Sequence, residues 1–153
     1  MAEFEGSYEE TFTVSVPIET AKKHYGDLDA IIAAYPNLDR GEKLDAKTVH
    51  YRLVPKNALG AEFRGEYRCE YTFTSDTRLE WRSVGEGNIK ATGSFDFKSL
   101  GDSRTQLVYR QALTLDMPVN RFLAKAIYPI VKVNIASGAK EYLEAMRKSL
   151  PKA

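Results

Sequence analysis

The sequence predicts an α+β domain in which a strongly curved antiparallel sheet of six or seven strands wraps around one long C-terminal helix. Between residues 49 and 115, apolar and polar residues alternate in successive runs, and the apolar side is rich in Tyr, Phe and Trp. After residue 118 the apolar residues recur every three or four positions instead. A one-sided aromatic sheet needs a cover, and the last thirty-odd residues are the obvious one.

One strand and two short helices are expected before that sheet. Residues 7–16 alternate and predict a half-buried strand, with Glu10 as the exception on its apolar side. Pro17 then suits the first position of a helix, because its φ is already helical and its missing N–H is not needed there. Asp29 can cap a second helix. Pro36 ends that helix, because the residue before a proline is pushed out of the α region.

Five further alternating runs predict an antiparallel meander. The longest spans residues 63–73, where charges of both signs occupy the outer face, as on a solvated antiparallel sheet. Gly65 and Gly93 lie within these runs on the apolar face, and a strongly curved sheet is the simplest reason for them. The other runs cover residues 49–53, 79–83, 89–97 and 105–115, with turns rich in Gly, Ser and Asp between them.

The last element is predicted to be a helix from about Asn120 to Leu150. Pro129 is expected to break or bend its first turns. Asn134 interrupts the apolar stripe, where it could hydrogen-bond a ligand or face a loop. Gly138 costs about 1 kcal/mol relative to alanine in a helix, so close packing or cavity space is expected there.

Length and composition predict one domain, residues 1–153, whose core is large enough to need no disulfide or metal. A chain of this length buries roughly 68–70% of its unfolded surface. The net charge of +1 and the mixing of both signs argue against a nucleic-acid partner. No stretch reaches the ~20 apolar residues of an integral membrane segment, and the first residues do not resemble a secretory signal. With one cysteine, Cys69, a cytoplasmic location is the expectation.

The order of these elements resembles the START-like (SRPBCC) superfamily, which has the helix-grip fold. The resemblance rests on the strand end at residues 14–19, the two helices up to Pro36, the strand pair 92–97 and 105–109, and the closing helix. The superfamily includes polyketide cyclases/dehydrases, coenzyme-Q-binding and lipid-transfer proteins, and the birch-pollen allergen family. The resemblance implies an internal cavity between sheet and helix that holds a lipid, sterol, quinone or polyketide-like molecule.

Tyrosines on the inward face suggest which residues would contact such a ligand. A buried hydroxyl without a partner costs ~1–3 kcal/mol, so inward phenols favour a cavity for a ligand of mixed polarity. The alternative is that they fill the core and point their hydroxyls at the rim. Gln111 and Asn134 are expected to orient a polar end of the ligand. The candidate ligand-binding residues are Tyr51, Tyr67, Tyr71, Trp81, Phe95, Tyr109, Gln111, Ile127, Val131 and Asn134.

Reversible binding of a small hydrophobic molecule, without catalysis, is the leading hypothesis. An enzyme of cyclase or aromatase type is the first alternative, with tyrosines and Glu10 transferring protons. A protein-interaction module with a collapsed cavity is the second. No catalytic residue, cofactor or metal site is predicted, because two histidines and one cysteine give no zinc-site spacing. Cys69, among aromatic residues, is expected to act as a small hydrophobe.

Overall fold

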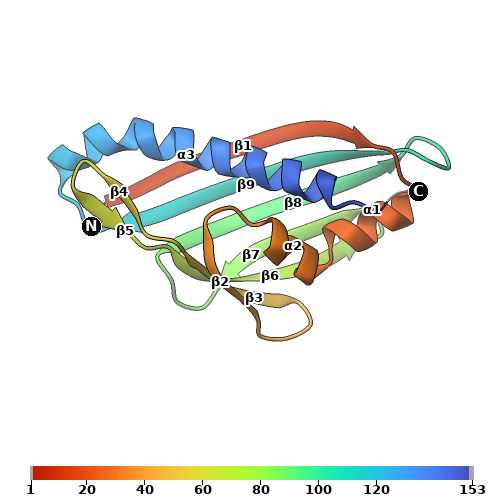
Figure 1. The fold of residues 1–153 in the computed structure, drawn as a ribbon, viewed down its shortest axis with the longest axis horizontal. Coiled ribbons are helices and arrows are strands. Elements are labelled where there is room, and N and C mark those ends of the chain that lie inside the picture. The colour runs from red at the N-terminus through yellow and green to blue at the C-terminus, as the bar shows by residue number, and fades with distance from the viewer. Residues whose placement is uncertain (1, 152–153) are drawn as a thin grey trace.

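The computed structural model describes residues 2–151 and confirms the predicted α+β helix-grip architecture (Figure 1). The strands are β1 (Ala2–Val14), β2 (Leu38–Lys43), β3 (Thr48–Leu53), β4 (Lys56–Ala58), β5 (Ala61–Phe63), β6 (Glu66–Ser75), β7 (Arg78–Val84), β8 (Ile89–Ser99) and β9 (Thr105–Met117). The helices are α1 (Ile18–Tyr25), α2 (Leu28–Ala34) and α3 (Arg121–Lys148). Seven strands form one antiparallel sheet in the order β1-β9-β8-β7-β6-β3-β2, while β4 and β5 pair separately.

The first and the last strand of the chain lie side by side in this sheet. β1 pairs with β9 from Ala2 opposite Met117 to Val14 opposite Thr105. β1 begins earlier than the predicted strand because Phe4 continues the inward alternation and is 1% exposed. Phe4 belongs to a small apolar cluster with Ile127 of α3, so this first part of the strand is fixed by packing under the helix.

The run at residues 63–73 is divided between two elements, which corrects the prediction of one continuous strand. Phe63 ends the β4–β5 hairpin, and β6 begins at Glu66. The side chain of Asn88 bridges this break: its Oδ1 accepts from the Glu66 N–H at 2.8 Å, and its Nδ2 donates to the Arg64 carbonyl at 2.8 Å. These bonds satisfy backbone groups that have no strand partner at the break, and the chain can therefore leave the sheet there.

Helix α3 is continuous through Pro129, so the predicted break does not occur. Pro129 is exposed, which lets water reach the carbonyl that loses its N–H partner. Asn120 caps the helix, its Oδ1 accepting from the Leu123 N–H at 2.8 Å. The buried face of α3 runs from Ile127 to Met146 along the concave side of the sheet. No helix in residues 2–151 is long and apolar enough to cross a bilayer.

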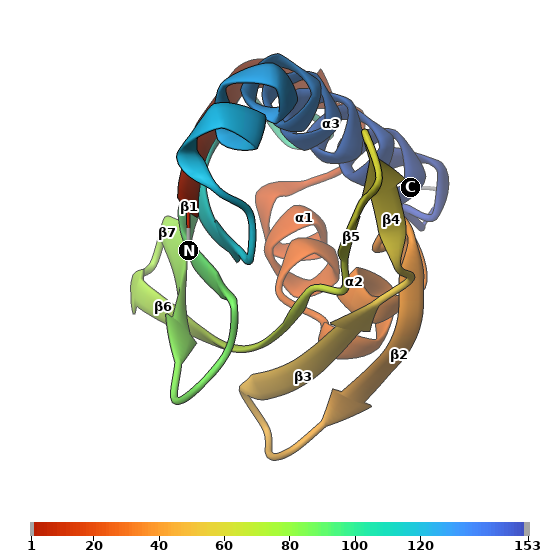
Figure 2. The ribbon, with the colours of Figure 1, turned by 90° about the vertical axis from the view of Figure 1, so that its left-hand side faces the viewer.

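The sheet and α3 form a trough whose two ends differ. Helices α1 and α2 cover one end, where Tyr25 and Ile31 are fully buried in the main core (Figure 1). At the other end the β4–β5 hairpin stands beside α3, as the view in Figure 2 shows. There Phe63 packs against the smaller cluster around Ile127. One end of the trough is therefore solid, and the other is framed by a short hairpin.

Candidate functional site

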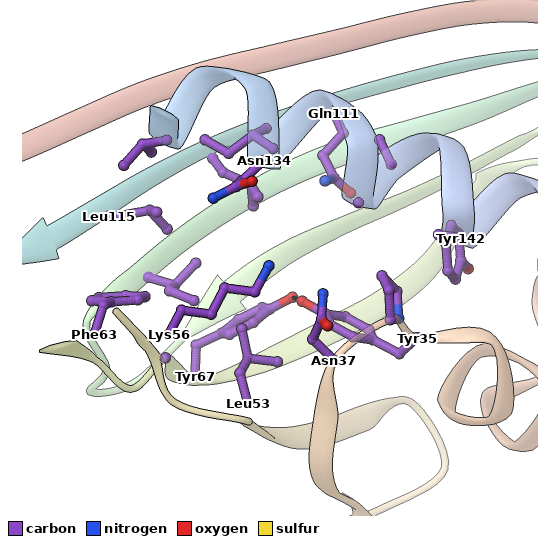
Figure 3. A pocket seen from close by; sticks show the side chains of 18 of the residues that line it. Tyr35, Asn37, Leu53, Lys56, Phe63, Tyr67, Gln111, Leu115, Asn134 and Tyr142 are labelled. Carbon is purple, nitrogen blue, oxygen red and sulfur yellow. Dashed lines mark hydrogen bonds between the residues drawn. The ribbon is translucent and has the colours of Figure 1, made fainter. Parts of the chain in front are cut away.

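A cavity of about 310 Å³ lies in the trough between the sheet and the middle of α3, from Ile127 to Tyr142 (Figure 3). This volume is at the lower end of the range of small-molecule sites, roughly 300–1,000 Å³. Three structural parts build its wall. The sheet contributes Tyr67, Tyr71, Trp81, Tyr109, Gln111, Leu113 and Leu115; α3 contributes Ile127, Ile130, Val131, Asn134 and Gly138; the segments around the opening contribute Tyr35, Asn37, Leu53, Lys56 and Phe63.

Most of the predicted site residues lie together in this wall. Tyr67, Tyr71, Trp81, Tyr109, Gln111, Ile127, Val131 and Asn134 all line the cavity. Tyr51 and Phe95 do not, although both point inward. The ring of Tyr51 packs against Tyr35 at the end of α2 (4.4 Å between centroids), and the ring of Phe95 against Tyr25 of α1 (5.0 Å). They belong to the solid end of the trough, because α1 and α2 cover that part of the sheet.

The residues around the opening were not predicted from the sequence. Asn37 follows Pro36 with φ 57°, and Lys56 begins the β4–β5 hairpin. Leu59 and Gly60 form the hairpin turn with φ values of 50° and 83°. Pro55, Asn57 and Gly60 are residue types that favour turns, and they were the local signal there. Asn37 and residues 56–60 have no apolar period, so their position beside the cavity could not be read from alternation.

Hydroxyl groups of the inward tyrosines are paired with one another. Tyr35 and Tyr67 share a hydrogen bond of 2.6 Å, and Tyr51 and Tyr71 share one of 2.5 Å. The Tyr109 hydroxyl donates to Gln111 Oε1 at 2.6 Å. These phenols therefore satisfy their polar groups without a ligand, and their orientation is fixed before anything enters the cavity.

Burial holds these phenols in the neutral form. It raises the pKa of Tyr67, Tyr71 and Tyr109 well above the ordinary value. Near neutral pH they can donate hydrogen bonds but cannot act as phenolate bases. Burial also raises the pKa of the Cys69 thiol to about 12, so this cysteine is a small apolar group next to the cavity wall and has little thiolate character.

Glu10, a candidate proton carrier in the enzyme alternative, lies away from the cavity wall. Its Oε1 accepts from the Tyr8 hydroxyl at 2.6 Å. This hydrogen bond, together with burial, raises the pKa of Tyr8 to about 12. Glu10 is half-buried on β1, and its polar end has a partner on the same strand. It therefore has no route to a molecule in the cavity.

Three glycines shape the wall in two ways. A Cβ on Gly93 would lie 2.3 Å from the Trp81 indole, and one on Gly65 would lie 2.7 Å from Ile89. These two glycines let side chains of neighbouring strands lie directly on the backbone. At Gly138 the only atom within 4 Å of such a Cβ is a Pro36 ring carbon at 3.9 Å, so the absent side chain leaves space at the cavity. The first two reflect close packing, and the third reflects cavity space.

Comparisons with known proteins identify the fold. No protein-family model and no curated protein sequence matches the chain. A START superfamily protein from Mycobacterium smegmatis matches with a TM-score of 0.69 at 15% identity, covering 94% of this chain and 96% of that one. The Zhui aromatase/cyclase from Streptomyces sp. R1128 matches at 0.66 and 14%, covering 95% and 93%. Norcoclaurine synthase from Thalictrum flavum, in complex with dopamine and hydroxybenzaldehyde, matches at 0.61 and 9%, covering 95% and 86%.

These similarities confirm the START-like helix-grip fold predicted from the sequence. They extend over nearly the whole chain, so the likeness includes the sheet, the two short helices and α3. At these identities the fold is shared but individual site residues do not transfer. The function must therefore be argued from the cavity of this chain.

Proposed function

We propose that the protein reversibly binds a small hydrophobic or amphipathic molecule in the cavity between the sheet and α3, without transforming it. The observation that carries this proposal is which side chains line the cavity wall. Aromatic and aliphatic side chains form most of it, and a few polar groups are placed among them, as is usual in small-molecule sites. Each hydroxyl of the tyrosine pairs already has one hydrogen-bond partner, so an apolar ligand can enter without leaving any of them unpartnered.

Binding without catalysis is preferred because the wall has few groups that can move protons. Among residues 2–151, no Asp, Glu or His lines the cavity. The phenols that do line it are held neutral by burial. A cyclase or aromatase remains the second candidate, favoured by the similarity to the Zhui aromatase/cyclase. In that case the wall would act by folding a reactive chain into the right geometry and by donating hydrogen bonds.

Filling the cavity from Gly138 tests the proposal. The Gly138→Leu variant places a side chain in the open space there, and leucine is also a better helix former than glycine. Binding of the neutral probe N-phenyl-1-naphthylamine, followed by its fluorescence, should weaken at least tenfold while the thermal midpoint does not fall. Ser137→Leu is the matched control, because Ser137 is exposed on the same helix and does not line the cavity. This control should bind like wild type.

Native mass spectrometry of protein purified from its own host gives an independent test. A small apolar molecule should travel with the folded chain and be released on unfolding. The proposal is wrong if wild type binds neither the probe nor any member of a lipid, quinone and polyketide panel. Equal loss of probe binding in the Gly138 and Ser137 variants would place the probe outside the cavity.

A further inference from the structure

The cavity wall carries a single formal charge. Among the described residues that line it, Lys56 is the only one with an ionisable group that is charged near neutral pH. Lys56 is the first residue of β4 and lies opposite Phe63 in the hairpin, and both residues line the cavity. Figure 3 shows the Lys56 ammonium directed into the cavity from the hairpin. Small-molecule sites commonly hold one charged residue among apolar side chains, where it fixes the orientation of the ligand.

No acidic residue of the described chain balances this ammonium. Within residues 2–151, Lys56 makes no ion pair and no side-chain hydrogen bond, whereas Lys43 is 2.9 Å from Asp29. The acid of the hairpin, Glu62, is opposite Asn57 and does not line the cavity. Lys56 is exposed at the opening, so water can solvate it while the cavity is empty. An anion entering the cavity would find the ammonium available.

Other polar groups of the cavity wall can also donate hydrogen bonds. Gln111 Oε1 is already used by the Tyr109 hydroxyl, which leaves the amide nitrogen of Gln111 as its free end. The Tyr35–Tyr67 pair uses one O–H for its mutual bond and leaves the other to donate. In Figure 3 the amide ends of Asn37 and Asn134 also point into the cavity. With one ammonium, several hydroxyl and amide donors and no carboxylate in the described wall, the site suits a group that accepts hydrogen bonds and carries negative charge.

We propose that the ligand is an amphipathic anion, whose acidic group pairs with Lys56 while its apolar body lies between the sheet and α3. This inference rests on the proposed function and specifies its ligand class. The apolar body has a matching surface in Leu113, Leu115 and Ile127. Because these walls displace water, the ion pair at their edge is stronger than one in bulk solvent. Lys56 is thus a specificity-determining residue, and the body of the ligand supplies the remaining affinity.

Three probes of equal chain length separate charge from apolar burial. Dodecanoic acid, dodecan-1-ol and dodecylamine, each below its critical micelle concentration, are titrated into wild type and variants by calorimetry. Wild type should bind the acid about tenfold more tightly than the alcohol, and added NaCl should weaken only the binding of the acid. Lys56→Met should remove this preference and leave the affinity for the alcohol within about twofold. Lys56→Glu should shift the preference to the amine.

Lys90→Met is the matched control, because Lys90 is exposed on β8 and does not line the cavity. It should keep the full preference for the acid. Equal affinity of wild type for acid and alcohol, or a preference that survives in Lys56→Met, overturns the inference while the proposed function stands. If wild type binds neither the acid nor the alcohol, the inference fails, and binding of N-phenyl-1-naphthylamine and of the panel decides the proposed function separately.

Discussion

Replacing Gly93 by alanine tests whether the cavity wall is built by direct contact between an indole and the sheet backbone. The added methyl group would lie 2.3 Å from Trp81 Cε2 and Cζ2, and 2.5 Å from Nε1. Trp81 is 7% exposed and packs on Phe95 and Tyr109, so its indole has little room to move within the core. The free side of the indole faces the cavity. We expect the indole to shift in that direction.

The expected loss of stability in Gly93→Ala follows from two opposing effects. Overpacking a filled core costs about 1–3 kcal/mol. Alanine also restricts the unfolded chain more than glycine does, which returns about 0.4–1 kcal/mol. The free energy of unfolding of Gly93→Ala should therefore fall by about 1–2 kcal/mol. For a chain of this size each kcal/mol lowers the thermal midpoint by about 2–4 °C, so a drop of about 2–8 °C is expected.

Urea unfolding followed by fluorescence measures both the stability and the indole. Trp81 is the only tryptophan of the chain, so its emission in the folded state reports directly on the contact. Gly138→Ala is the matched control with the opposite sign: its methyl group meets open space inside a helix, and stability should rise by about 1 kcal/mol. If Gly93→Ala unfolds at or above the wild-type midpoint with unchanged emission, Trp81 does not lie on Gly93 and the reasoning fails.

Three further predictions concern buried hydroxyl and thiol groups. Burial raises the pKa of the cavity tyrosines in the folded state, so the free energy of unfolding is unaffected by these groups below their unfolded pKa near 10 and should fall above it by up to about 1.4 kcal/mol per pH unit for each buried phenol. Tyrosinate absorbance and loss of circular dichroism should then appear together. Stepwise ionisation of a folded protein would contradict this. Tyr51→Phe leaves the Tyr71 hydroxyl without its 2.5 Å partner and should lower the free energy of unfolding in urea by about 1–3 kcal/mol. Tyr25→Phe removes a buried hydroxyl that has no partner within residues 2–151, so it should leave stability unchanged or raise it. Equal losses of stability in the two variants would refute the assigned hydrogen bonds. Cys69 should resist a disulfide reagent at pH 8 until urea unfolds the chain, since burial raises its pKa to about 12; rapid modification of native protein would show that the thiol is accessible.

Alternation predicted which face of the sheet is inward, but not what each inward residue meets. Tyr67 and Tyr51 have the same signature in the sequence and are both buried, yet Tyr67 lines the cavity and Tyr51 lies under α2. The difference depends on how far α1 and α2 extend over the sheet, which is a tertiary property. The burial pattern of a strand therefore narrows the candidate site without separating cavity wall from packed core.

Elements without an apolar period could not be predicted from the sequence. β2 is predominantly polar and lies at one edge of the sheet, where one of its backbone sides needs no partner strand. The break before Glu66 was hidden because the alternation continues across it. Lys56 escaped notice because it is an isolated lysine in a connecting segment, and only the position of the hairpin brings it to the cavity.

The pairing of β1 with β9 has a consequence for how the chain acquires its structure during synthesis. β1 leaves the ribosome long before β9, the strand that completes its hydrogen bonds, and α3 follows later still. Until β9 and α3 have been made, the apolar side chains of β1 have neither a neighbouring strand nor a helix to cover them. Contacts so distant in sequence close slowly, typically over milliseconds to seconds in β-rich domains. β1 must therefore remain unpaired until β9 has been made, a period in which its exposed edges favour aggregation.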